Sequence, residues 1–156
     1  MPQQGAMCLL ESVRAWDAAG IVCRAVSHLD PAHPLRAEGR LGAVCGIEYG
    51  LQAAAAHGAL SGGAPQGRAL RGGGPTAPGW FAALREAELL TDRLDRPEFG
   101  ALEVSATLEA AGAGGMIYRF AVQAEDGRPL LRGRATIALR PPGVPAATTA
   151  AAPIPP

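Results

Sequence analysis

The sequence is poor in aromatic residues and cysteine, and it has no excess of charge of either sign. With 2 Trp, 2 Tyr and 3 Phe, the core has to be built mainly from Ala, Leu, Val and Ile. The 14 basic residues, all of them arginine, balance 14 acidic residues, so nothing in the charge favours nucleic-acid binding. The length of 156 residues predicts one domain with a substantial core.

The few cysteines exclude several kinds of site. Cys8, Cys23 and Cys45 lie far apart and form no CxxC pair, which argues against a zinc site or a thioredoxin-type motif. An odd number of cysteines without a signal peptide is typical of the reducing cytoplasm, so we expect a cytoplasmic protein. We expect neither a metal nor a cofactor.

The most informative segment covers residues 41–60, which are largely small and apolar and carry one formal charge, Glu48. A helix of this length spans roughly 30 Å, and a helix apolar on nearly all sides has to be buried on nearly all sides. The segment also has the length of a membrane span. Glu48, Gln52 and His57 would be costly at bilayer depth, and no basic cluster flanks the segment. We therefore predict a central buried helix rather than a membrane span.

Alternating or β-branched patterns predict an antiparallel sheet around this helix. A hairpin is expected where a turn interrupts the first pattern, and an Asp-Gly pair marks a second hairpin later in the chain. The predicted segments are a hairpin over residues 8–28 turning at 17–20, and strands over 101–109, 116–124 and 130–139, the last two joined at 126–127.

The remaining segments are less regular. Residues 29–42 are rich in turn signals, and residues 61–79 have the composition of a mobile loop. Residues 80–94 favour a helix by propensity, because Ala, Leu, Glu and Arg dominate and no β-branched residue comes before Thr91. We predict a single domain over residues 1–140 and a disordered tail over residues 141–156, which has little to bury.

Four blocks of the sequence resemble the hotdog-fold 3-hydroxyacyl-acyl-carrier-protein dehydratases, above all the branch associated with aryl polyene and polyketide-like clusters. The resemblance implies an α+β hotdog fold, in which a curved antiparallel sheet wraps around one long central helix. It also implies a strand over residues 80–91, against their helix propensity. The blocks are GAMCLLESVRAWD at residues 5–17, SHLDPAHPLR at 27–36, GRLGAVCGIEYGLQAAAAHGAL at 39–60 and MIYRFAVQAEDGRPLLRGRATIAL at 116–139.

The resemblance also implies catalytic residues. Members of this group use a histidine from the loop before the helix and an acid from the helix. Glu48 matches the acid, and its burial would favour the protonated form that donates a proton. His33 matches the histidine, although the spacing to Glu48 is one residue longer than usual and the Phe-Pro-Gly surroundings are missing. His28, just upstream, is the substitute.

We expect four further residues to bind the substrate. Unpaired backbone N–H groups at the helix start, around Cys45 and Gly46, would stabilise the thioester oxygen as it gains charge, and Gly46 would let the substrate approach closely. Gln52, one turn after Glu48, would orient the acid. Arg36 would meet the phosphopantetheine or an acidic carrier protein.

These features predict dehydration of 3-hydroxyacyl thioesters to 2-enoyl thioesters in fatty-acid or polyene-type biosynthesis. The substrate would be carried by an acyl carrier protein or by CoA. The resemblance further implies a homodimer, or a heterodimer with another hotdog protein, whose active sites lie at the interface. Two alternatives stay open: a non-catalytic hotdog subunit that pairs with an active dehydratase, and an acyl thioesterase, because the same fold hosts both.

Overall fold

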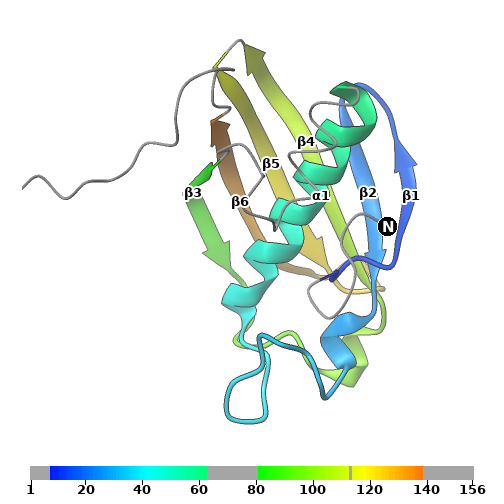
Figure 1. Ribbon diagram of the computed structural model, residues 1–156. Helices are drawn as coiled ribbons and strands as arrows, with labels where there is room; N and C mark the ends of the chain where they lie inside the picture. The colour runs from blue at the N-terminus through cyan, green and yellow to red at the C-terminus, as the bar shows by residue number, and fades with distance from the viewer. Residues whose placement is uncertain (1–7, 63–80, 113, 139–156) are drawn as a thin grey trace, which may run out of the picture.

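The computed structural model describes residues 8–62, 81–112 and 114–138, in which one helix packs on one face of an antiparallel sheet (Figure 1). The six strands follow the order β1-β2-β4-β5-β6-β3, and β1 and β3 are the two edges of this open sheet within the described residues. The elements are β1 (Ser12–Trp16), β2 (Gly20–Ala25), α1 (Gly46–Gly62), β3 (Phe81–Leu89), β4 (Leu102–Gly112), β5 (Gly115–Gln123) and β6 (Pro129–Ala138), with short 3-10 turns η1 (Ser27–Leu29), η2 (Ala43–Cys45) and η3 (Pro97–Phe99).

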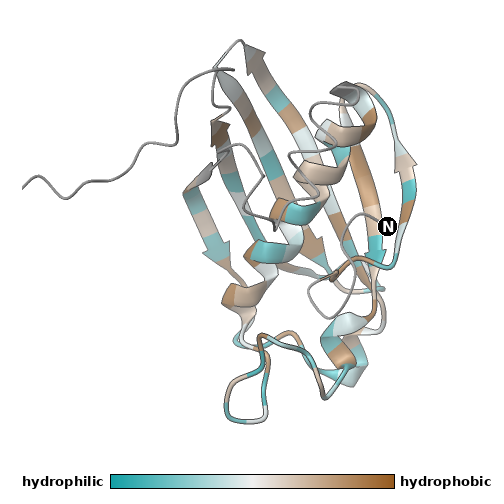
Figure 2. Cartoon of the chain, viewed as in Figure 1, coloured by the Kyte–Doolittle hydropathy of each residue, from teal (hydrophilic) through white to brown (hydrophobic). Residues whose placement is uncertain are grey.

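The predicted hairpins and the alternating strands are confirmed. In the first turn, the Asp17 carboxylate accepts hydrogen bonds from the N–H groups of Ala19 and Gly20, at 2.8 and 3.0 Å. In the second, the N–H of Gly127 donates to the carbonyl of Ala124 at 2.9 Å. Apolar and polar residues alternate along β4 to β6, so one face of the sheet packs on α1 while the other meets solvent (Figure 2).

Strand β3 forms although its residues have an intrinsic propensity for helix. Residues 81–89 form a strand, as the family resemblance implied, and the helix favoured by their composition is wrong. The strand pairs antiparallel with β6 from Phe81 opposite Ala138 to Leu89 opposite Leu131, with an irregularity between Arg85 and Glu88. Hydrogen bonds to a neighbouring strand outweigh a weak intrinsic preference for helix.

The central helix begins later than the sequence indicated. Helix α1 starts at Gly46, and residues 41–45 are extended or form the turn η2. The N–H of Ala43 donates to the carbonyl of Asp92 at 3.0 Å, and that of Leu94 donates to the carbonyl of Leu41 at 2.9 Å. The predicted helical start at residue 41 is therefore wrong, because these backbone groups bond to the segment after β3 instead of to one another.

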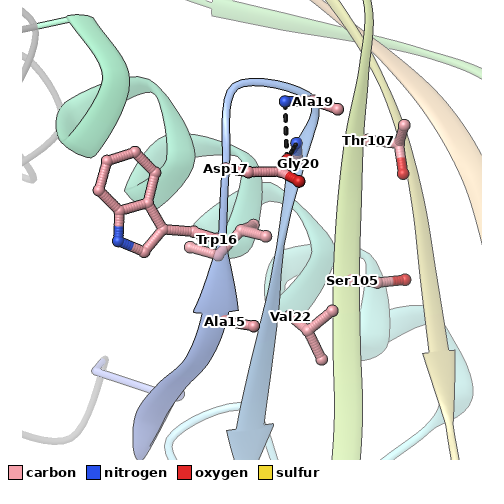
Figure 3. A pocket seen from close by; sticks show the side chains of 9 residues that line it. Ala15, Trp16, Asp17, Ala19, Gly20, Val22, Ser105 and Thr107 are labelled. Carbon is pink, nitrogen blue, oxygen red and sulfur yellow. Dashed lines mark hydrogen bonds between the residues drawn. The ribbon is translucent and has the colours of Figure 1, made fainter.

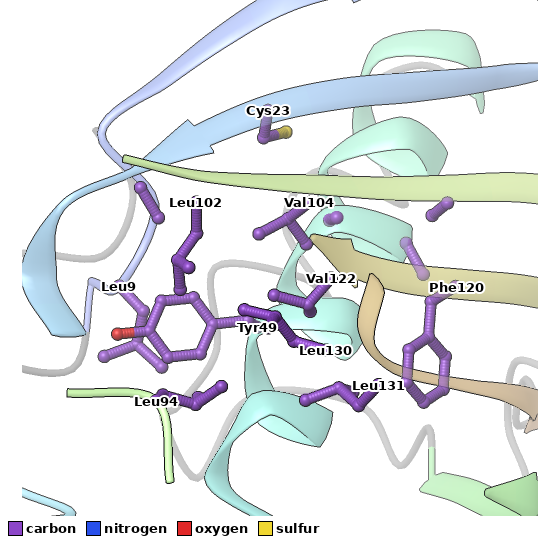
Figure 4. Packing of buried hydrophobic residues seen from close by; sticks show 14 of the residues in the cluster. Leu9, Cys23, Tyr49, Leu94, Leu102, Val104, Phe120, Val122, Leu130 and Leu131 are labelled. Carbon is purple, nitrogen blue, oxygen red and sulfur yellow. The ribbon is translucent and has the colours of Figure 1, made fainter. Parts of the chain in front are cut away.

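Close packing joins α1 to the middle of the sheet. Gly50 lies against the ring of Phe120, and a Cβ at residue 50 would collide with that ring. Tyr49 extends toward Leu9 and Leu102, while Phe120 lies further along the core near Leu131 (Figure 4). A small residue on the helix thus lets one of the few aromatic side chains fill the space between the layers.

Some predictions fall on parts of the chain that the structure does not describe. These are the tail over residues 141–156 and, from residue 63 on, the loop expected over 61–79; residues 61 and 62 complete α1. In residues 8–62, 81–112 and 114–138, no helix is long and apolar enough to cross a membrane.

Candidate functional site

Glu48 lies on the most open side of α1. Its side chain is half-buried, and so are Ile47, Leu51 and Ala56 near it along the helix. The expectation that this helix is buried on nearly all sides is wrong in this region, because the open sheet covers one side of α1. The result is an apolar, partly open stripe that carries one carboxylate.

Gln52 contacts Glu48, as the sequence predicted. Its side-chain amide nitrogen donates to Glu48 Oε1 at 3.4 Å, and its amide oxygen accepts the N–H of Leu9 at 3.0 Å. The second bond fixes which end of the amide faces the carboxylate. Gln52 therefore restricts the position of Glu48 by tying it to the segment before β1.

His33 is buried, and both of its ring nitrogens are engaged. Nδ1 accepts the N–H of Leu35 at 3.1 Å, so Nε2 carries the proton and donates to the Tyr49 hydroxyl at 3.0 Å. The Tyr49 hydroxyl in turn bonds the Ser27 hydroxyl at 2.7 Å, and Ser27 donates to the carbonyl of Leu9 at 2.7 Å. Each donor in this chain of bonds has an acceptor, which favours a neutral imidazole that holds the loop onto the helix.

His28 differs from His33 because only one of its two ring nitrogens has a hydrogen-bond partner in the described part of the chain. Its side chain is fully buried, and Nε2 donates to the carbonyl of Gly100 at 2.8 Å. That bond leaves the lone pair on Nδ1, which has no hydrogen-bond partner among the described residues. A buried acceptor without a partner costs about 1–3 kcal/mol, so its presence calls for an explanation.

Gly100, which accepts from His28, needs to be glycine. Its backbone has φ 61° and ψ −148°, a combination that side chains disfavour. A Cβ there would also collide with the Glu125 side chain. The carbonyl that orients His28 is thus presented by a backbone conformation available to glycine.

Arg36 uses its donors within the chain. Its guanidinium bonds three backbone carbonyls, those of His28 at 3.2 Å, Asp30 at 2.8 Å and Gly39 at 3.3 Å, and also the Asp95 carboxylate at 2.9 Å. Its side chain is 16% exposed, and that of Asp95 is 3% exposed. The substrate contact that we expected of Arg36 stays a prediction; the geometry favours a clamp on the loop.

The backbone donors expected at the helix start are already paired. The N–H of Cys45 donates to the carbonyl of Gly42 at 3.1 Å, and that of Gly46 donates to the carbonyls of Ala43 and Val44. The expectation of unpaired donors at these two residues is wrong, because η2 adds a turn ahead of α1 and satisfies them. A Cβ on Gly46 would collide with Leu131, so packing of α1 on β6 also explains this glycine.

His57 has a structural environment. It is fully buried, its Nε2 donates to the carbonyl of Asp17 at 2.7 Å, and its Nδ1 accepts from the Tyr118 hydroxyl at 2.7 Å. The ring thereby ties α1 to the turn between β1 and β2 and to β5. His57 is therefore a core histidine with both ring nitrogens satisfied.

A shallow surface groove lies away from these residues, at the turn between β1 and β2. Figure 3 shows Trp16 and Asp17 at this turn, with Ser105 and Thr107 on β4. Ser105 and Thr107 alternate with buried residues of β4, so the groove belongs to the face of the sheet opposite α1. It contains none of the predicted site residues. In the described ranges, no group of three or more His, Cys, Asp or Glu residues is arranged to hold a metal ion.

Burial of His28 and His33 predicts that stability depends on pH. Desolvation lowers the pKa of both imidazoles below the ordinary value of 6.5. As the pH falls through that value, the unfolded chain binds protons that the folded chain does not, so the free energy of unfolding decreases. Thermal unfolding at about pH 7.5 and about pH 5.5 should show a lower Tm at the acidic pH.

His33→Gln provides the control for this prediction. It removes one of the two titrating groups, so the drop in Tm between the two pH values should become smaller. An unfolding free energy that is flat over this range would contradict the prediction.

Comparisons with known proteins bear on the family and on the fold. A sequence model of the ApeP-like family, described as ApeP dehydratase, matches residues 1–147. The chain is similar to the dehydratase heterocomplex ApeI:P from Xenorhabdus doucetiae, with 17% identity and a TM-score of 0.65 over 91% of this chain and 89% of that one. Among curated proteins, none matches this chain.

Two further structures show the same arrangement of helix and sheet. AziG from S. sahachiroi has 16% identity and a TM-score of 0.56 over 86% of this chain and 94% of that one. A mutant of the thioesterase PA1618 from Pseudomonas aeruginosa has 16% identity and a TM-score of 0.54 over 83% of this chain and 80% of that one. At these identities the structural likeness shows the fold, which dehydratases and thioesterases share.

Three residues around the candidate site escaped the sequence analysis. Ser27, Tyr49 and Asp95 carry no recognisable motif. Their partners lie far away along the chain: 22 positions separate Ser27 from Tyr49, and 59 separate Asp95 from Arg36. A polar residue next to a candidate histidine was the one available signal for Ser27.

Proposed function

The chain belongs to the ApeP-like dehydratase family, and from this membership we propose that it removes water from 3-hydroxyacyl thioesters bound to an acyl carrier protein. The family match, which covers residues 1–147, carries the reaction type. The partly open apolar stripe beside Glu48 supports an acyl substrate, because an alkyl or polyene chain gains free energy when it leaves water. The product is the 2-enoyl thioester.

We assign the base to His28 rather than to His33. Nδ1 of His28 has a lone pair and no partner among the residues that the structure describes, whereas both nitrogens of His33 already bond the protein. In the proposed step, Nδ1 takes the proton from C2 of the substrate, and the electron pair of that C–H bond forms the C2–C3 double bond. Because His28 is fully buried in the single chain, the assignment requires the loop to admit the thioester when the substrate binds.

Glu48 completes the elimination as the acid. In its protonated form it gives its proton to the C3 hydroxyl, which leaves as water, and Gln52 holds the carboxyl in place. The positive end of the α1 dipole favours the negative charge that grows on the thioester oxygen. Exchange with solvent then carries the proton from His28 back to Glu48, which resets the site for the next turnover.

We further propose that this chemistry takes place in a dimer. Strand β3 pairs with β6 on one side and leaves its other edge open within the described residues, and Leu84 and Leu89 on it are 42% and 47% exposed. An open edge with exposed leucines favours pairing with another strand. The similar structure from Xenorhabdus doucetiae is a heterocomplex, which supports a second hotdog subunit as the partner.

The test is the conversion of a 3-hydroxyacyl carrier-protein thioester by the purified chain, alone and mixed with a second, active hotdog dehydratase. Mass spectrometry of the carrier protein should show loss of water with the thioester intact. Release of the acyl group would support a thioesterase instead. Turnover in the mixture that survives both His28→Ala and Glu48→Ala in this chain would make it a non-catalytic subunit.

Substitution of the histidines tests the assignment of the base. His28→Ala should lower kcat about 100-fold or more, the scale of general base catalysis. His57→Ala is the matched control, because it removes another fully buried histidine whose two nitrogens are both engaged in structural bonds. It should lower Tm but leave kcat of the folded protein unchanged; equal losses of kcat would contradict the assignment.

A further inference from the structure

Four charged or titratable groups meet around His28 where the loop after β2 approaches the segment after β3. The loop after β2 contributes His28, His33 and Arg36, and the segment after β3 contributes Asp95. The Arg36–Asp95 ion pair joins the two segments at 2.9 Å and is largely shielded from water. Nothing in the proposed chemistry uses this pair directly.

Arg36 organises the backbone that carries His28. Its guanidinium donates to the carbonyls of His28, Asp30 and Gly39, so it holds three points of one loop. A planar guanidinium presents five N–H donors in a fixed fork, which a lysine ammonium cannot reproduce. The ring of His28 is anchored separately, at the carbonyl of Gly100.

Asp95 fixes the guanidinium in turn. Its Oδ2 accepts from Arg36 at 2.9 Å and from Arg93 at 2.7 Å, and its Oδ1 accepts from Arg93 Nε at 2.7 Å. Hydrogen bonds from Arg93 and the backbone N–H of Leu41 hold the pKa of Asp95 well below its usual range. The carboxylate therefore stays charged at any pH at which the protein would work, so the Arg36–Asp95 ion pair does not depend on pH in that range.

From this geometry we propose that Arg36 and Asp95 are positioning residues for His28: they hold the loop that presents its Nδ1 and set the charge that the ring faces. The proposal rests on the function proposed above, in which His28 is the base. The proposed role requires neither residue to touch the reacting atoms. Their effect passes through the backbone carbonyl of His28 and through the electric field at its ring.

The two members of the pair act on the imidazolium in opposite directions. Burial is the main cause of the low pKa of His28, and the bond to the Gly100 carbonyl opposes it. Around the ring, His33 and the Arg36 cation lower this pKa, and the Asp95 carboxylate raises it. Loss of the carboxylate charge should therefore lower the pKa of His28, whereas loss of the guanidinium charge should raise it.

Three variants separate the effect of the charges near the His28 ring from the effect of the loop geometry: Asp95→Asn, Arg36→Gln and Arg36→Lys. The first two variants should shift the pKa of His28 down and up, respectively, and Arg36→Lys should leave it near its native value, because it keeps the charge. All three should lower kcat about 10-fold or more with KM within about 2-fold, because a misplaced base slows the reaction without weakening binding. Asp92→Asn is the matched control, since Asp92 lies in the same segment but is exposed and pairs with Arg40 and Arg96.

Two readouts keep this test independent of the proposed reaction. NMR titration of the 3 histidine rings, assigned with His33→Gln and His57→Gln, gives the pKa of His28 without any turnover. If the pKa of His28 shifts in opposite directions in Asp95→Asn and Arg36→Gln, the proposed effect of the two charges on His28 is supported. If the protein then shows no dehydration, the proposed function fails while the charge effect on His28 is kept. Shifts of the same sign, or native kcat in a folded Asp95→Asn, would overturn the proposal. Should Asp95→Asn not fold, native kcat in Arg36→Lys would overturn it equally.

Discussion

Glu48→Gln should lower kcat by about 100-fold to 10,000-fold, the range that general acid catalysis contributes. The amide has the shape of the carboxyl group but cannot give up a proton to the C3 hydroxyl. Gln52, which contacts Glu48 Oε1 at 3.4 Å, can contact the new amide oxygen in the same way. Because the fold is kept, KM and Tm should stay close to native. Steady-state dehydration assays and thermal unfolding measure these quantities.

Glu103→Gln is the matched control for this variant. Glu103 is also half-buried and also accepts a hydrogen bond from a glutamine amide, that of Gln123 at 2.8 Å, but it lies on the outer face of β4. The control should keep native kcat. If kcat of Glu48→Gln is within about 3-fold of native, Glu48 is not the general acid and is a structural carboxylate.

Phe120→Ala should destabilise the protein by about 3–5 kcal/mol, the largest stability effect that we expect from a single side chain. Phe120 is fully buried and is one of only 3 Phe residues in the chain. Its ring fills the space that Gly50 on α1 and Gly133 on β6 leave open. Chemical denaturation measures the loss, and Thr107→Ala, an exposed position of β4, should change stability by less than about 0.5 kcal/mol.

A double-mutant cycle tests whether Gly50 and Phe120 are fitted to each other. Gly50→Ala alone forces a Cβ into the ring of Phe120 and should be clearly destabilising. In the Phe120→Ala background the same Cβ meets empty space, so the cost should shrink or change sign. Additive effects of the two substitutions would show that the ring does not limit residue 50.

The sequence drew attention to some residues of the candidate site and not to others. The sequence identified Glu48 because a single acid stands out in an apolar helix, and Gln52 follows from helical spacing. The resemblance placed His33 first and His28 as its substitute, and our proposal reverses that order. The reversal rests on their partners: one ring nitrogen of His28 bonds a carbonyl and the other has no partner in the described part of the chain, whereas both ring nitrogens of His33 are engaged.

The role of Arg36 shows the same limit. An arginine before an apolar helix looks like a surface residue that meets an anionic substrate. Its actual partners are the carbonyls of its own loop and Asp95, which lies 59 positions away in the sequence. No local sequence pattern predicts the Arg36–Asp95 contact, because it depends on how two loops pack against each other in the folded chain.

The sequence by itself determined the features that depend on local periodicity: the hairpin turns, the alternation along β4 to β6, and an apolar helix with one acid. The strand at residues 81–89 followed from the family resemblance and not from local propensity. The tertiary structure alone decided that Glu48 faces a partly open stripe, and which imidazole keeps a ring nitrogen without a partner among the described residues. The reason is physical. Periodicity fixes which side of an element is apolar, whereas hydrogen-bond partners and exposure are fixed by segments that meet only after the chain has folded.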